Sequence, residues 1–178
     1  MHVLLIDNND SFTRNLEHLL ATSITGAVIS VEPYARLAEL DLSTADLIVI
    51  SPGPGAPEEY PGYGRVFESG VPVLGVCLGM QILNEHFGGE TGRLPGCVHG
   101  QTDTIVWQGR EACVARYHSL CATRVGDDLD VLARNVAGVV MALGSQQRRV
   151  LGFQFHPESF LTDDGGAFLA DACAYLSL

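Results

Sequence analysis

Two patterns meet in the segment Val71-Pro72-Val73-Leu74-Gly75-Val76-Cys77-Leu78-Gly79-Met80-Gln81-Ile82-Leu83-Asn84-Glu85-His86-Phe87-Gly88-Gly89. Residues 71–76 form a short apolar run, which is typical of a strand buried on both faces of a parallel sheet. A helical pattern follows from Leu78 to His86, and the glycine pair after Phe87 ends it. The segment therefore predicts a strand that turns at Cys77 directly into a helix, which is the repeating unit of an α/β fold.

Earlier apolar runs extend this pattern toward the N-terminus. Residues 2–6, 27–31 and 47–50 each have the length and composition of a buried strand. We expect a helix after the first run, capped by Ser11, because the apolar residues from Phe12 to Leu20 fall on one helical face. The third run ends at Ser51-Pro52-Gly53-Pro54-Gly55, which suits neither a helix nor a strand. Alternating strands and helices predict an open, mostly parallel, flavodoxin-like central sheet flanked by helices.

The second half of the chain has a different rhythm. Short strand-like segments with short connections occur at residues 104–107, 113–117, 131–134, 139–143 and 150–155. Such segments favour antiparallel or mixed pairing, so we expect a smaller antiparallel or mixed portion beside the parallel sheet. A last amphipathic helix is expected over residues 166–176. Because no linker, repeat or low-complexity segment interrupts the sequence, residues 1–178 are predicted to form one α/β domain.

The composition excludes several classes of function. Hydrophobic residues make up 47% of the 178 residues, which is enough for a sizeable core. Ten basic and 21 acidic side chains give a formal net charge of −11, so a nucleic-acid partner is not expected. All ten basic residues are arginines. Without lysine the chain can form neither a lysine Schiff base nor a phosphate-binding loop of the Gly-Lys-Ser/Thr kind.

Cysteine spacing and the lack of targeting signals favour a cytoplasmic location. No apolar run approaches the roughly 20 residues that span a bilayer, so a membrane partner is not expected. The N-terminal residues 1–7 lack the basic leader of a signal peptide. The five cysteines are an odd number without Cys-x-x-Cys spacing, which argues against disulfides and structural zinc. We expect neither a metal nor a cofactor.

The sharpest local signal is Gly75-Val76-Cys77-Leu78-Gly79, which has the form Gly-x-nucleophile-x-Gly. On a tight strand-to-helix turn a cysteine is held in a strained conformation, and the helix N-terminus favours its thiolate. The backbone N–H of Leu78 would point to the place where an oxyanion forms. Free cysteines are often small buried core residues, and the pentapeptide alone leaves the two interpretations evenly balanced.

A thiol nucleophile needs a base, and His156 is the best placed of the six histidines. It follows the apolar run that ends at Phe155, and open α/β sheets place their ligand sites at the carboxyl ends of strands. Glu158 could orient and stabilise the imidazole as the third member of a triad. A polar turn is the slightly favoured interpretation of His156-Pro157-Glu158 taken alone. Its combination with Cys77 favours catalysis.

Five ordered motifs resemble those of one family. They are Asp7-Asn8-Asn9-Asp10-Ser11-Phe12-Thr13, Ser51-Pro52-Gly53-Pro54-Gly55, Gly75-Val76-Cys77-Leu78-Gly79-Met80-Gln81, Arg116-Tyr117-His118-Ser119-Leu120 and Gln154-Phe155-His156-Pro157-Glu158-Ser159. In this order they resemble the triad-type (class I) glutamine amidotransferases. The combination is most similar to the glutaminase subunits of anthranilate synthase and aminodeoxychorismate synthase. The resemblance extends from Asp7 to about Thr162.

The resemblance implies a role for each matched residue. Cys77 would attack the side-chain amide of glutamine, His156 would act as general base and acid, and Glu158 would orient His156. The backbone N–H of Leu78 and one from the Gly53–Gly55 loop would form the oxyanion hole. Glycines allow a backbone to approach a ligand closely, which agrees with these roles. The other glutamine contacts would come from Gly53, Pro54, Gly55 and Gln81, and at the α-amino-acid end from the backbone of Ser119 and Leu120.

The resemblance also implies a partner. A glutaminase subunit hydrolyses L-glutamine and passes ammonia to a chorismate-binding synthase subunit, component I, which makes anthranilate or 4-amino-4-deoxychorismate. The motifs leave these two branches open. Two other functions also stay open: a stand-alone γ-glutamyl hydrolase or peptidase with the same triad, and a non-catalytic regulatory subunit. A flavodoxin-like nucleotide binder is a weaker alternative, because it leaves Cys77 and the His-Pro-Glu segment unexplained.

Three positions depart from the family pattern. Met80 stands where many relatives have a histidine, and Gln101 stands where a basic residue is common. The stretch from Trp107 to Arg116 is short, because relatives usually insert a segment there, so the shape of the loop beside the pocket is open. His99 is interpreted as a structural residue near the pocket. His118 is interpreted as a bystander whose neighbours supply the backbone contacts.

Overall fold

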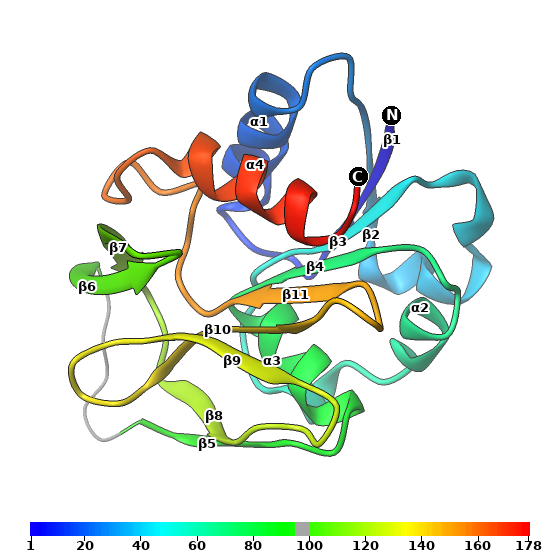
Figure 1. Cartoon of the computed structure of the whole chain (residues 1–178). Coiled ribbons are helices and arrows are strands. Elements are labelled where there is room, and N and C mark those ends of the chain that lie inside the picture. The colour runs from blue at the N-terminus through cyan, green and yellow to red at the C-terminus, as the bar shows by residue number, and fades with distance from the viewer. Residues whose placement is uncertain (95–99) are drawn as a thin grey trace.

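The computed structural model describes residues 1–94 and 100–178, and a seven-stranded sheet lies at its centre (Figure 1). The strands of this sheet, in spatial order, are β2 (Val28–Pro33), β1 (His2–Asp7), β3 (Leu47–Ile50), β4 (Val73–Val76), β11 (Val150–Phe153), β10 (Val140–Ser145) and β9 (Asp130–Arg134). From β2 to β11 the strands are parallel, and β10 runs against both of its neighbours. The predicted mostly parallel α/β sheet is confirmed.

Helices cover both faces of the sheet (Figure 1). One face carries α1 (Thr13–Ser23) and α4 (Gly165–Tyr175), and the other carries α2 (Gly64–Phe67) and α3 (Leu78–His86). Alternate residues of β1 point into the two cores, Val3 and Leu5 into the first and Leu4 and Ile6 into the second. The apolar runs are therefore strands buried on both faces. Three short 3₁₀ helices lie at Tyr34–Glu39, Leu42–Thr44 and Pro57–Glu59.

The start of α1 differs from the prediction. Ser11 does not cap the helix, because α1 begins at Thr13 and its N-cap residue is Phe12. The end of β1 organises this turn instead. Asp7 Oδ1 accepts hydrogen bonds from the N–H of Asn9 at 2.9 Å and from Thr13 Oγ1 at 2.7 Å. A carboxylate that accepts several hydrogen bonds organises a turn more strongly than a hydroxyl does, so the expected role of Ser11 is wrong.

Two small antiparallel sheets lie beside the central sheet. One pairs β5 (Glu90–Arg93) with β8 (Leu120–Arg124), and the other pairs β6 (Gln101–Trp107) with β7 (Arg110–Arg116). The predicted antiparallel portion is thus confirmed. Neither β5 nor β8 is among the predicted strands. The sequence of β5, Glu90-Thr91-Gly92-Arg93, is short and has no apolar alternation that would indicate a strand.

The short stretch from Trp107 to Arg116 forms a tight β-hairpin. Residues of β6 and β7 pair in register from the hairpin end, Trp107 with Arg110, to Gln101 with Arg116. Gln108 and Gly109 form the turn and have φ angles of 48° and 78°. Two successive positive φ angles are typical of a type I′ turn, whose twist matches that of the flanking strands. A two-residue turn therefore closes the hairpin, and both strands extend beyond the predicted ranges 104–107 and 113–117.

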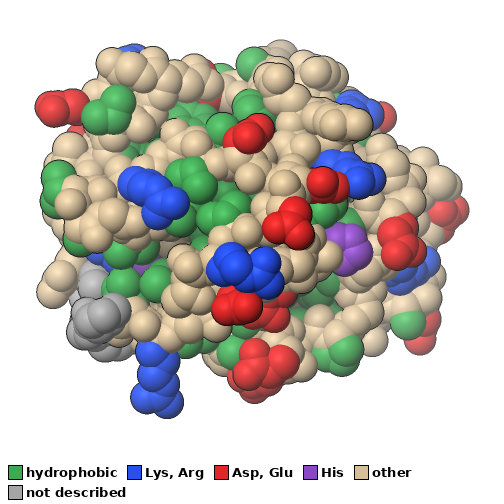
Figure 2. Space-filling model, turned by 60° about the horizontal axis from the view of Figure 1, so that its bottom comes forward, with side chains coloured by type: hydrophobic (Ala, Val, Ile, Leu, Met, Phe, Trp, Pro, Cys, Tyr) green, Lys and Arg blue, Asp and Glu red, His purple; other side chains and the backbone are tan. Residues whose placement is uncertain are grey.

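The surface carries charges of both signs. Arginine and acidic side chains lie intermixed on the face shown in Figure 2. Arg124 pairs with Glu90 at 3.2 Å, and Arg148 pairs with Asp128 at 2.6 Å. The charge on this face is therefore mixed, whereas nucleic acids bind to a clustered basic patch. Within residues 1–94 and 100–178, no helix has the length and apolar character needed to cross a membrane.

The turn from β4 into α3 depends on two glycines. A Cβ on Gly75 would lie 2.5 Å from the backbone of Gly79, and a Cβ on Gly79 would overlap the backbone oxygen of Ile50 in β3. Strand and helix can approach this closely only without side chains at both positions. The Gly-x-Cys-x-Gly pattern is thus explained by packing between β3, β4 and the first turn of α3.

We predict that Gly79→Ala destabilises the fold by about 3 kcal/mol, because the new methyl group meets backbone that cannot move without disturbing the sheet. Gly64→Ala is the matched control, since its Cβ would lie 3.9 Å from the nearest atom, in His86. This control should unfold at the wild-type urea concentration or slightly above it. Urea unfolding followed by circular dichroism measures both variants. Equal midpoints for Gly79→Ala and the wild type would contradict the packing argument.

Candidate active site

The carboxyl ends of β1, β3, β4 and β11 meet at one edge of the sheet. The chain passes from β1 outward to β2 and from β3 to β4 in the opposite direction, so a topological switch point lies between β1 and β3. A cleft of about 460 Å³ lies at this edge. It is lined by Cys77 and by every residue that the sequence predicts for the glutamine pocket: Gly53, Pro54, Gly55, Leu78, Gln81, Ser119 and Leu120.

Cys77 occupies the turn between β4 and α3. Its φ and ψ angles are 53° and −103°, a conformation that costs about 1–3 kcal/mol for a residue other than glycine. Its N–H donates a hydrogen bond to the carbonyl of Phe153 at 2.7 Å, which ties the turn to β11. The sulfur lies at the N-terminal end of α3, where the helix dipole and free N–H groups favour negative charge. The predicted strained cysteine at a helix start is therefore present.

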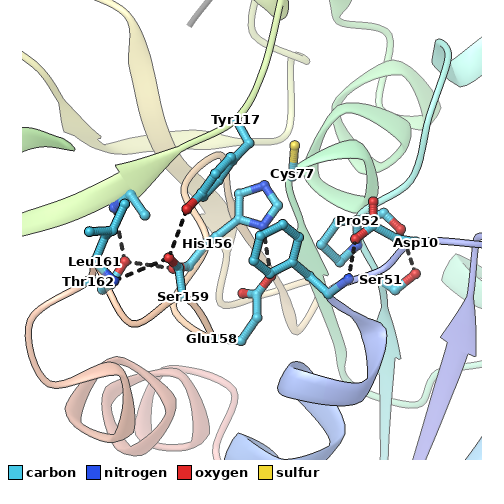
Figure 3. A network of polar contacts seen from close by, with 12 residues as sticks. Asp10, Ser51, Pro52, Cys77, Tyr117, His156, Glu158, Ser159, Leu161 and Thr162 are labelled. Carbon is cyan, nitrogen blue, oxygen red and sulfur yellow. Dashed lines mark hydrogen bonds and ion pairs between the residues drawn. The ribbon is translucent and has the colours of Figure 1, made fainter. Parts of the chain in front are cut away.

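His156 and Glu158 form a buried pair just after β11 (Figure 3). His156 Nδ1 lies 2.7 Å from Glu158 Oε1, and the two residues are 2% and 8% exposed. The backbone N–H of His156 donates to the carbonyl of Ala115 at 3.0 Å, which anchors the residue to β7. Because Glu158 accepts the Nδ1 proton, Nε2 is left to act on a reacting group. Nε2 has no hydrogen-bond partner among the described residues, and Figure 3 shows the Cys77 sulfur beside the ring.

The pKa of His156 lies well above its ordinary value. Burial acts to lower this pKa, because a charged imidazole loses hydration inside the protein. Negative charge on the neighbouring Cys77 and Glu158 outweighs burial, and the hydrogen bonds to them act in the same direction. The surroundings therefore favour a protonated imidazole beside the sulfur, as a thiolate–imidazolium pair requires.

Two aromatic rings hold the imidazole in place. The ring of Phe12 lies 5.3 Å from that of His156, and the ring of Tyr117 lies 5.1 Å from it in an edge-to-face contact. Phe12 and Tyr117 also contact each other at 4.9 Å. The sequence predicts Phe12 on the core face of the first helix, but the residue precedes α1 and packs against the site. Rings at these separations restrict how the imidazole can turn.

Sequence reasoning also missed Gln154. Its side chain is fully buried, its Nε2 lies 3.7 Å from Cys77 Sγ, and its Oε1 accepts a hydrogen bond from Gln81 Nε2 at 3.1 Å. Gln81 Nε2 also donates to the backbone oxygen of Leu120 at 3.2 Å. A polar residue inside the apolar run 150–155 is the signal that could have indicated this role, because buried polar groups need partners.

The loop that contains Gly53 is locked from below. Asn8 donates from its backbone to Ser51 Oγ at 2.9 Å and from its side chain to the backbone oxygen of Ser51 at 3.0 Å. Tyr63 donates to Asn8 Oδ1 at 2.6 Å. A Cβ on Gly53 would lie 2.6 Å from Leu78 Cδ2, so the loop packs directly against the start of α3. These contacts fix the backbone groups of the loop relative to Cys77.

Two remaining expectations concern metals and histidines. No group of three or more potential ligands that could hold a metal ion occurs in the part of the chain that the structure describes. His99, which the sequence suggests is a structural residue, lies outside the described residues. His118 lines the cleft and is 4% exposed.

The fold is similar to that of a solved structure. A GMP synthase component from Thermoplasma acidophilum superposes with a TM-score of 0.85, and the alignment covers 99% of this chain and 94% of that one. The sequences are 21% identical, so the likeness concerns the fold alone.

Sequence relatives are closer. Anthranilate synthase component 2 of Archaeoglobus fulgidus is 39% identical over 92% of this chain and 92% of its own length. An aminodeoxychorismate synthase of Streptomyces griseus is 39% identical over 96% of this chain but only 25% of its own length. Other relatives are longer as well, and the chain spans 48% of the length of one and 25% of another. The model of the family "Glutamine amidotransferase class-I" matches residues 4–175. This chain belongs to the class-I glutamine amidotransferase family.

Proposed function

We propose that residues 1–178 form one glutamine amidotransferase domain that hydrolyses L-glutamine to L-glutamate and ammonia. The observation that carries this proposal is the juxtaposition of Cys77, at the start of α3, with the buried pair of His156 and Glu158 (Figure 3). Membership of the class-I family supports the same chemistry. The cleft beside Cys77 is lined mainly by backbone and neutral polar groups, which suits a zwitterionic amino acid.

In the proposed reaction the Cys77 sulfur attacks the side-chain amide carbon of glutamine. The protonated His156 gives its proton to the leaving nitrogen, the C–N bond breaks, and ammonia leaves a γ-glutamyl thioester on the sulfur. His156 then takes a proton from water while the water oxygen attacks the thioester carbon. The C–S bond breaks, glutamate leaves, and the thiolate–imidazolium pair returns. Glu158 stays ionised and stabilises the imidazolium throughout.

Backbone donors would stabilise the oxyanion that forms in both steps. The N–H of Leu78 and one N–H of the Gly53–Gly55 loop are the groups that we assign to this role. Both segments line the cleft next to Cys77, and Gly53 packs directly against Leu78. Donors held rigidly before the reaction stabilise developing charge without reorganisation, which is the largest electrostatic contribution in many enzymes.

We further propose that the ammonia passes to a separate chorismate-utilising synthase. The Archaeoglobus relative is an anthranilate synthase component 2 and has a similar length, and the Streptomyces relative is an aminodeoxychorismate synthase. A net charge of −11 fits this division of labour, because an acidic chain is a poor host for the anionic chorismate. The synthase partner would then determine whether anthranilate or 4-amino-4-deoxychorismate is made.

Glutaminase activity should depend on the synthase. We expect low activity for the isolated chain and a rise in kcat/KM of about tenfold or more when the synthase is added, within the range typical of coupled sites. Steady-state release of glutamate, measured with and without the synthase, tests this dependence. Full activity in isolation, together with hydrolysis of γ-glutamyl amides larger than glutamine, would instead identify a stand-alone γ-glutamyl hydrolase. Absence of hydrolysis under both conditions would contradict the glutaminase proposal itself.

A further inference from the structure

His118 makes two buried hydrogen bonds in the wall of the cleft. Its Nε2 lies 3.0 Å from Arg116 Nε, and its Nδ1 lies 2.7 Å from the backbone oxygen of Leu120. Sequence alone suggests that His118 is a bystander in a motif whose backbone binds the ligand. The two contacts give it a specific role, because they leave one arrangement of its proton.

The arginine determines the tautomer of His118. An arginine side chain donates hydrogen bonds and accepts none, so His118 Nε2 must supply the lone pair. The single ring proton therefore sits on Nδ1 and is donated to the Leu120 carbonyl. Burial lowers the pKa of His118 to about 4, and the nearby Arg116 acts in the same direction. The ring thus stays neutral near pH 7, with its donor directed at the cleft wall.

Arg116 is itself held by a buried ion pair. Its Nη1 lies 2.8 Å from Asp103 Oδ2, and the two side chains are 8% and 17% exposed. Asp103 Oδ2 also accepts a hydrogen bond from Asn135 Nδ2 at 2.6 Å. These residues come from β7, from β6 and from the end of β9, so several elements fix the guanidinium. A second layer of fixed groups is what keeps a binding site rigid.

The Leu120 carbonyl connects His118 to the reacting cysteine. It accepts hydrogen bonds from His118 Nδ1 and from Gln81 Nε2, which uses both of its lone pairs. Gln81 in turn donates to Gln154, whose amide nitrogen contacts Cys77 Sγ. A shift of this carbonyl would therefore move both the Ser119–Leu120 wall and the Gln81 side chain.

We infer that His118, held by Arg116, is a positioning residue for glutamine. It fixes the Leu120 peptide in the cleft wall and, through the shared carbonyl, the side chain of Gln81. The inference rests on the proposed glutaminase function, and it predicts that the Nδ1 donor matters for substrate binding more than for the chemical steps.

Two amide variants separate the contacts of His118. Asparagine places an amide nitrogen where Nδ1 lies, so His118→Asn keeps the donor to Leu120 and loses the acceptor for Arg116. Glutamine places its amide near Nε2, so His118→Gln keeps the acceptor and loses the donor. We expect His118→Gln to raise KM for glutamine about tenfold with little change in kcat, as for the loss of one buried hydrogen bond. His118→Asn should keep KM within about threefold of wild type. His18→Gln, at an exposed position of α1, is the control.

The kinetic measurement uses the chain together with its synthase, and circular dichroism records the folding of each variant. Equal KM values for His118→Gln and wild type, or equal increases for both amide variants, would overturn the inference. Nitrogen-15 NMR of the isolated chain gives a readout independent of activity. A neutral His118 with its proton on Nδ1 between pH 6 and 8 is expected, and a proton on Nε2 would overturn the inference even for an inactive protein. A wild-type complex that does not hydrolyse glutamine would count against the proposed function, and the NMR result would still decide the tautomer.

Discussion

The Cys77→Ala variant is expected to lose glutamine hydrolysis, with a fall in kcat of about 10⁴-fold or more, because the covalent route disappears with the sulfur. The same substitution should abolish labelling by an electrophilic glutamine analogue. The fold should survive, since Cys77 is a small side chain at the edge of the core and alanine relieves none of the glycine contacts around it. Mass spectrometry of the labelled protein, with steady-state glutamate release, measures both effects.

Cys173→Ala is the matched control for this experiment. Cys173 lies in α4 and is half-buried, and burial raises the pKa of its thiol. A protonated thiol is a poor nucleophile at neutral pH, so this variant should keep wild-type activity and labelling. Labelling of Cys77→Ala at the wild-type rate would show that another group reacts, and the proposed thioester would have to be abandoned.

The part of the fold that could be predicted from sequence is the part with local signals. An apolar run, a turn at Cys77 and a helix from Leu78 to His86 appear in the sequence as they appear in the structure. The two glycines around Cys77 also have a local reason, since neither tolerates a Cβ where β4 meets α3. Strand β5 could not be predicted, because its four residues are polar and only the partner strand β8 makes them extended.

The part of the site that the sequence did not reveal depends on contacts between distant segments. The residues predicted for the glutamine pocket came from the motifs and line one cleft. Gln154 and Phe12 belong to the same motifs, but their contacts with Cys77 and His156 cross many residues of sequence. Propensity and periodicity describe neighbours along the chain, and therefore neither contact could be predicted from them.

The same limit explains the change in the interpretation of His118. In sequence it is one polar residue between Tyr117 and Ser119, and a bystander role is the simplest assignment. In the structure Arg116 lies on one side of its ring and the Leu120 carbonyl on the other, so the ring has a defined tautomer. A histidine acquires a role of this kind from which nitrogen is free, and only the folded arrangement fixes that.

Glu158→Gln is expected to lower kcat by about 10³-fold, an effect of the size seen when the orienting carboxylate of a triad is replaced by an amide. Glu158 Oε1 accepts the Nδ1 proton of His156, and its side chain is fully buried. An amide nitrogen in the same place would donate to Nδ1 and move the ring proton to Nε2. In that tautomer the imidazole cannot take a proton at the atom that faces the reaction.

The pH dependence should change in a defined direction. Cys77 and Glu158 raise the pKa of His156 against the effect of burial, so the wild-type imidazolium survives above its ordinary pKa. Without the carboxylate, burial carries more weight and the pKa of His156 falls. The alkaline limb of the kcat/KM profile should therefore move to lower pH in Glu158→Gln, and Glu158→Asp, which keeps the charge, should lie between the variant and wild type. Steady-state glutamate release across the pH range measures this. An alkaline limb that stays in place in Glu158→Gln would mean that the carboxylate does not support the imidazolium, and Glu158 would then be a structural residue of the turn after β11.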